Sequence, residues 1–125
     1  MVIHNNFQDF VLFLYIYMAL ADNYLHPSEE EVILGKMSKL FPTETNPKQK
    51  LDAASSHYKT LAHDEVMDII RNTFKQFNHI KFAQKYKVYT DMYDVINADG
   101  KVGEAEKIAL DALKEIIDLN SEVRN

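Results

Sequence analysis

Two short segments of this 125-residue chain carry an acidic pair at the same spacing. Glu29 follows Asp22 by seven positions, and Glu106 follows Asp99 by the same interval. Both segments fit the pattern A-D-[NG]-x-[LV]-x-x-x-E, in which Asn or Gly, the residues that best tolerate a positive φ, comes directly after the aspartate. The pattern predicts a tight bend with a carboxylate at either end. Carboxylate oxygens are the ligands that hard divalent cations prefer.

The second segment also matches the later half of an EF-hand calcium loop, Asp-Gly-x-apolar-x-x-x-Glu. In this alignment Asp99 and Glu106 are ligands, Lys101 offers a backbone carbonyl, and Asn97 occupies a further ligand position. Val95 stands where an EF-hand has its first aspartate, so one loop does not supply the 6–8 oxygens that calcium prefers. A metal site would need both loops to converge, or help from neighbours. The candidate neighbours are His26, Glu30, Asp94 and Glu104.

A structural role accounts for the same carboxylates without a metal. If His26 and Gly103 are helix N-caps, Glu29 and Glu106 fall at the third helical position. A glutamate there can accept a hydrogen bond from the N-cap amide, and the aspartates can satisfy amides of the turn. Other residue types cap equally well, yet both loops retain the same acidic pair. The duplication therefore favours a bound divalent metal, Ca²⁺, Mn²⁺ or Zn²⁺, over capping alone.

Six helices are expected to position these loops, because their apolar residues recur at helical spacing and the chain has only 3 Gly and 3 Pro. Their expected ranges are 6–22, 27–41, 48–60, 64–77, 81–97 and 104–119. Each acidic loop joins two apolar helices. We therefore expect one all-α domain, residues 1–125, built from two pseudo-symmetric helix-loop-helix units at about 7–41 and 81–119, with the third and fourth helices between them.

An apolar run at residues 11–21 resembles a secretory signal or a membrane anchor at first sight. No Lys or Arg precedes it, and it is far shorter than the ~20 residues that span a bilayer. We expect it to be a helix buried on nearly all sides. The absence of Cys fits a reducing environment, so a cytoplasmic protein without a transmembrane segment is expected.

Several function classes are disfavoured by composition and motif. The net charge of −5 argues against a nucleic-acid binder, which needs clustered Lys and Arg. The five His residues form no HExxH motif, and no GxSxG elbow, P-loop or GxGxxG is present. The lack of catalytic motifs indicates that the protein is not an enzyme, and it disfavours a carboxylate metallohydrolase.

The segments ALADNYLHPSEEEVI and NADGKVGEAEKIAL resemble the two halves of the TerB-like tellurite-resistance domain, over roughly 7–41 and 81–119. The resemblance implies an all-α fold and a metal-binding or metal-sensing role in tellurite and other chemical-stress systems. It also implies protein partners in complexes near the inner face of the membrane, which the chain would reach through those partners. It marks Asp22, Glu29, Asp99 and Glu106. The chain departs from the family pattern at Asn23, where Gly is usual, and in its middle segment.

The favoured interpretation is a non-catalytic divalent-metal-binding or metal-sensing module of a stress response. The alternative is a metal-independent helical adaptor that presents an acidic or tyrosine-bearing face to a protein partner. The tyrosines in question are Tyr86, Tyr89 and Tyr93, which recur along the expected fifth helix and are candidates for a partner surface or a dimer face.

Overall fold

The computed structural model describes residues 7–21, 25–76, 82–98 and 103–121, and within these ranges it contains six α-helices and no strand. The helices are α1 (Phe7–Ala19), α2 (Pro27–Leu40), α3 (Pro47–Tyr58), α4 (His63–Gln76), α5 (Phe82–Ile96) and α6 (Glu104–Ser121). All six expected helices are confirmed, each to within three residues at either end. Two of the helices begin at a local signal: Pro27 and Pro47 occupy the first helical positions of α2 and α3, where a missing N–H is harmless.

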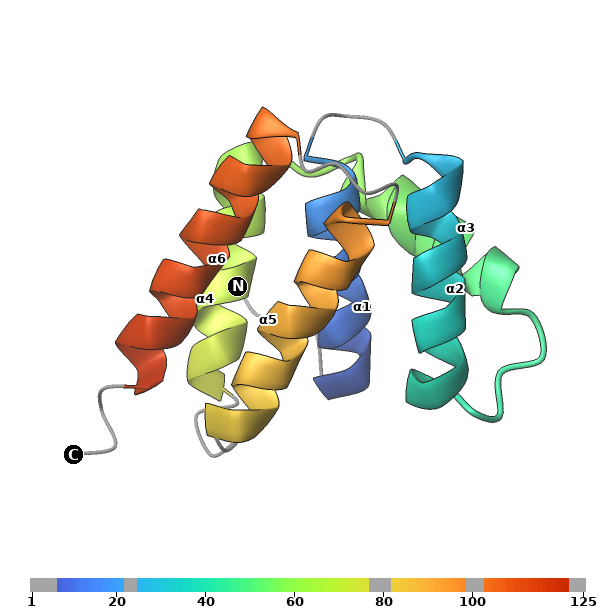
Figure 1. Cartoon of the computed structure of the whole chain (residues 1–125), viewed down its shortest axis with the longest axis horizontal. Coiled ribbons are helices and arrows are strands. Elements are labelled where there is room, and N and C mark those ends of the chain that lie inside the picture. Colours follow the sequence, from blue (N-terminus) through green and yellow to red (C-terminus); the bar gives the residue numbers. More distant parts are fainter. Residues whose placement is uncertain (1–6, 22–24, 77–81, 99–102, 122–125) are drawn as a thin grey trace.

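Helix α1 lies at the centre of the molecule and is packed by α2, α3, α5 and α6 (Figure 1). Every side chain from Phe10 to Leu20 is buried, which confirms that the apolar run belongs to the core. A helix surrounded by neighbours must be apolar on all sides, as this one is. In the part of the chain that the structure describes, no helix is long and apolar enough to cross a membrane.

Helices α1 and α5 end, and α2 and α6 begin, at the same end of the molecule (Figure 1). Helix α5 packs directly on both α1 and α2. The expectation that the third and fourth helices lie between the two helix-loop-helix units is therefore wrong. Instead, α3 covers α1 and α2 on one flank, and α4 packs against α6 on the other. The all-apolar surface of α1 explains this arrangement, since it accepts helices from both units directly.

The buried faces of α5 and α6 do not include every apolar residue at helical spacing. Tyr86 and Tyr93 on α5 and Ile108 on α6 have that spacing, but they are 51%, 45% and 62% exposed. Helix α5 instead buries an aliphatic face, formed by Val88, Met92, Val95 and Ile96. The helix packs through these residues because their side chains have no polar group that loses hydration on burial, whereas the exposed tyrosines keep their hydroxyls in water.

Candidate functional site

The two repeated glutamates begin helices at the same end of the molecule. The Glu106 Oε1 atom accepts a hydrogen bond from the Gly103 backbone N–H at 2.9 Å, at the start of α6. At the start of α2, Glu29 Oε1 accepts from the His26 backbone N–H at 3.1 Å. His26 has extended backbone angles, as an N-cap residue should. Both glutamates thus form the hydrogen bond that the capping interpretation requires.

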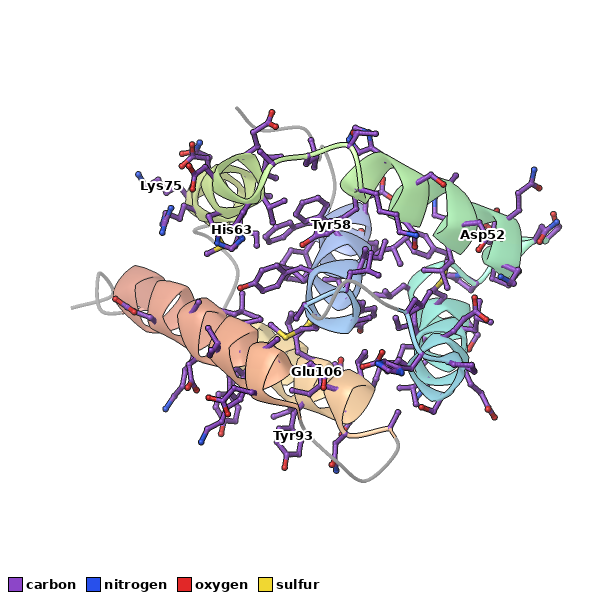
Figure 2. All side chains as sticks on the ribbon, turned by 90° about the horizontal axis from the view of Figure 1, so that it is seen from above. Asp52, Tyr58, His63, Lys75, Tyr93 and Glu106 are labelled. Carbon is purple, nitrogen blue, oxygen red and sulfur yellow. The ribbon has the colours of Figure 1, made fainter. Side chains whose placement is uncertain are left out.

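Burial sets these two glutamates apart from most acidic side chains. Glu29 is 3% exposed and Glu106 is 6% exposed. In Figure 2, viewed from the end where α2 and α6 begin, Glu106 lies on the inner side of α6, toward α1. Glutamate is almost never fully buried unless it has a partner, because the charge loses its hydration. The positive end of each helix dipole offsets part of this cost.

Some of the remaining candidate ligands lie outside the described residues, and the others lie within them. Asp22 and Asp99 lie outside the described residues, as does Lys101. His26 is half-buried, and Asn97 and Glu104 are exposed. Within the described ranges, no three His, Asp or Glu side chains are grouped so that they could hold a metal ion. A site of the expected kind therefore depends on the two aspartates.

Asp94 belongs to a polar cluster on the α2–α5 contact. Lys36 Nζ of α2 lies 3.2 Å from Asp94 Oδ2 and 3.0 Å from Asp91 Oδ1, while the Tyr15 hydroxyl donates to Asp91 Oδ2 at 3.5 Å. Burial raises the pKa of Tyr15, and Asp91 raises it further. Burial alone would lower the pKa of Lys36, but the hydrogen bonds to both aspartates outweigh it and raise that pKa. Asp94 is thus engaged in joining two helices.

The start of α4 carries the same capping bond without an acidic loop before it. Glu65 Oε1 accepts from the Ala62 backbone N–H at 2.9 Å, and Glu65 is exposed. At the start of α3 the Asn46 side chain accepts from the Gln49 N–H at 3.1 Å. Side-chain capping is therefore common to several helices of this chain, whereas burial of the capping glutamate is a property of α2 and α6.

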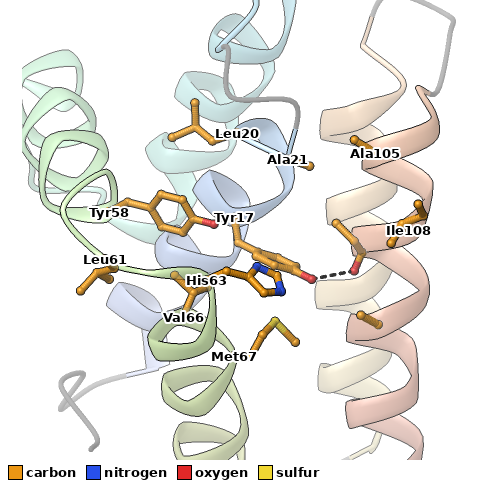
Figure 3. Close-up of a pocket in the computed structure, with 12 residues that line it drawn as sticks. Tyr17, Leu20, Ala21, Tyr58, Leu61, His63, Val66, Met67, Ala105 and Ile108 are labelled. Carbon is orange, nitrogen blue, oxygen red and sulfur yellow. Dashed lines mark hydrogen bonds between the residues drawn. The ribbon is translucent and has the colours of Figure 1, made fainter.

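A cavity of about 400 Å³ lies between α1, α4 and α6, and sequence reasoning did not anticipate it (Figure 3). Its apolar walls come from Leu20, Val66, Met67, Ala105, Ala109 and Ala112 among others. The polar groups at its walls belong to Tyr17, Tyr58 and His63. The cavity is assembled from segments far apart in the chain. The sequence feature related to this cavity is the spacing of the alanines on α6, which can be interpreted only when the facing helix is known.

The tyrosines of this cavity are held in their neutral form. The Tyr17 hydroxyl donates to the Ala109 carbonyl oxygen at 3.0 Å. Burial raises the pKa of Tyr17 to about 12, against a smaller opposing effect of the Arg71 guanidinium. Burial, with a contribution from Tyr17, also raises the pKa of Tyr58 to about 12. Both tyrosines are therefore uncharged around neutral pH, and together with the apolar walls they suit an uncharged, largely apolar group.

Comparison of the chain with protein-family models, with curated proteins and with solved structures yields no match. The resemblance to TerB-like domains consequently rests on the residues of the two loops. Function must be argued from the geometry and chemistry of the site, because a helical fold alone hosts many activities.

Proposed function

We propose that the chain is a non-catalytic module that binds or senses a divalent cation at the end of the molecule where α2 and α6 begin. A stress-response role follows from the resemblance of both loops to TerB-like domains. The observation that carries the proposal is the burial of Glu29 and Glu106, compared with the exposure of Glu65, which makes the same capping bond. Because a cap does not require burial, we take the burial of both carboxylates as support for a second role.

A divalent cation suits these carboxylates on chemical grounds. A buried carboxylate is costly unless it is paired or coordinates a metal. Asp22 and Asp99, which follow the α1 and α5 segments in the sequence, are the candidates for further oxygen ligands. An all-oxygen donor set favours Ca²⁺ or Mn²⁺, whereas Zn²⁺ would call on the imidazole of His26. We expect one ion per chain, shared by both loops.

Calorimetric titration of Ca²⁺, Mn²⁺ and Zn²⁺ into chelator-treated protein tests this proposal. Saturable binding near one ion per chain is expected, and Asp99→Ala and Glu106→Ala should abolish it. Glu65→Ala is the matched control, since it removes a capping glutamate at α4 and should leave the titration unchanged. Absence of binding heat at millimolar concentrations of all three metals would contradict the proposal and favour the adaptor.

The adaptor alternative has its own supporting observation on α5. Tyr86 and Tyr93 are about half exposed, and the Tyr86 and Tyr89 rings stack with their centroids 5.9 Å apart. Exposed tyrosines are enriched at protein interfaces because they combine apolar area with a hydrogen-bonding tip. This role would be insensitive to chelators, which separates it from cation binding in any partner assay. In such an assay Tyr86→Ser and Tyr93→Ser should weaken partner binding, and full binding by both variants would exclude this face.

A further inference from the structure

We infer that the cavity between α1, α4 and α6 is a docking site for a basic amphipathic helix of a partner protein. The inference goes beyond cation binding and does not depend on it. Three features of the described residues carry it: an incompletely covered helix face on α6, the position of Ile108, and the charges around the cavity.

Helix α6 presents a packing face that its neighbours do not fully cover. Ala105, Ile108, Ala109 and Ala112 all line the cavity, and they are spaced i, i+3, i+4 and i+7. This is the spacing by which one helix packs against another. The three alanines leave room for close approach of a second helix. Helix α4 meets part of this face, but a volume of about 400 Å³ remains between them.

Ile108 distinguishes a helix from a small molecule as the occupant. It lines the cavity yet is 62% exposed, so apolar surface continues from the cavity onto the outside of α6. A small ligand inside the cavity would leave most of Ile108 in water. A helix lying along α6 would cover Ile108 and also insert an apolar side chain between Tyr17 and Met67, both of which line the cavity.

The charges that border the cavity are mainly acidic. On α6, exposed Glu104 and Asp111 are spaced i−4 and i+3 from Ile108, and exposed Glu115 is i+3 from Ala112. Exposed Asp64 follows the lining residue His63 on α4. Of the cations, exposed Lys59 follows the lining residue Tyr58, and the Arg71 guanidinium lies 3.7 Å from Asp68. Lys107 and Lys114 fall on the opposite side of α6 by helical geometry. This rim complements a basic partner helix and repels an anionic lipid surface.

Fluorescence anisotropy with designed peptides tests the inference, in buffer containing EDTA so that the cation site plays no part. The probe is a labelled helical peptide with a Leu/Ala face flanked by lysines. One control peptide has glutamates in place of the lysines, and a second has serines in place of the leucines. We expect saturable binding of the lysine probe, weaker binding of both controls, and an affinity that falls as salt is raised.

Variants of the protein locate the binding. Ile108→Ser and the cavity-filling Ala112→Phe should each weaken the lysine probe about tenfold, which is about 1.4 kcal/mol. Ala53→Ser is the control, since it replaces an exposed apolar side chain on α3 that does not line the cavity, and it should have no effect. Glu104→Gln combined with Asp111→Asn should weaken binding at low salt more than at high salt.

Three results would overturn the inference. They are equal binding of the lysine and glutamate peptides, an Ile108→Ser variant that binds as well as Ala53→Ser, and no saturable binding of any peptide. Sedimentation of the unmodified protein adds a fourth result. Self-association that Ile108→Ser abolishes would identify a second copy of the chain, rather than a basic partner, as the occupant.

Discussion

The start of α4 and the starts of α2 and α6 use the same hydrogen bond in different surroundings. At each, a glutamate at the third helical position accepts from an N-cap amide, over 2.9–3.1 Å. Glu65 does so in solvent, while Glu29 and Glu106 do so almost fully buried. Capping therefore explains where these residues stand in the sequence, but not why two of them are enclosed by the fold. We propose a bound cation as the reason for this enclosure.

The largest difference between the two regions should appear when the side chains are truncated. Glu65→Ala should cost about 1 kcal/mol, the usual value of a lost cap. Glu29→Ala and Glu106→Ala should each cost about 2 kcal/mol, because a buried side chain is also lost and the part-buried N-cap amide loses its acceptor. The double variant should cost about 4 kcal/mol if the two sites are independent. Urea unfolding in the presence of EDTA measures all four values.

Equal losses at the three positions would remove the distinction between the two regions. The buried glutamates would then be caps like any other, and the cation proposal would lose its main support. Asn46→Ala provides the reference for a solvent-exposed cap at α3, and it should match Glu65→Ala at about 1 kcal/mol.

A pH series tests two cavity-lining tyrosines, Tyr17 and Tyr58, separately from the capping glutamates. Tyr17 and Tyr58 have pKa values of about 12 in the folded protein, above the ordinary 10. Their contribution to stability is complete below pH 10 and is lost as pH rises through 10 to 12, because the unfolded chain releases these protons first. At pH 11 each tyrosine should have lost about 1.4 kcal/mol, or about 3 kcal/mol together. Urea midpoints from pH 8 to 11 measure this loss together with that of Tyr15, whose pKa is also raised.

Single variants test the origin of this pH dependence. Tyr58→Phe should remove about a third of the loss between pH 10 and 11, because Tyr17 and Tyr15, whose pKa values are also raised, contribute over the same range. Glu106→Gln should leave it unchanged, since Glu106 does not line the tyrosine-bearing cavity. A Tyr17→Phe, Tyr58→Phe double variant should keep only the part of the loss that belongs to Tyr15, and an undiminished loss would assign the dependence to groups other than Tyr17 and Tyr58.

Glutamine variants measure directly how much a bound cation would stabilise the folded protein. Each keeps an acceptor oxygen for the N-cap amide but lacks the charge. With free metal at about ten times its dissociation constant, the unmodified protein should gain about 1.4 kcal/mol of stability. Glu29→Gln and Glu106→Gln should lose this gain, and Glu65→Gln should keep it. Thermal unfolding with and without metal shows the contrast, and a gain retained in all three variants would place the ion elsewhere.

Much of this fold could be predicted because its signals are local. Helix limits follow from Pro27, Pro47 and the spacing of apolar residues, and the capping positions of Glu29 and Glu106 follow from counting along the helix. Burial could not be predicted in the same way. It depends on which helices surround a position, so the enclosure of the two glutamates was missed. The cavity was missed for the same reason, since its walls come from distant segments.

The smallest expected effect concerns the N-cap residues of the two buried starts, His26 and Gly103. A Cβ atom added at Gly103 would lie 3.1 Å from Glu106 Oε1, a tight contact with the end of a flexible side chain. His26 already carries a Cβ at the matching position of α2, and Glu29 still accepts from its amide. Gly103→Ala should therefore change the free energy of unfolding by less than about 0.5 kcal/mol, because Glu106 can shift by a few tenths of an ångström. Urea unfolding would detect a loss of 2 kcal/mol or more, which would show that Glu106 is held more rigidly than Glu29 and that the two helix starts are not equivalent.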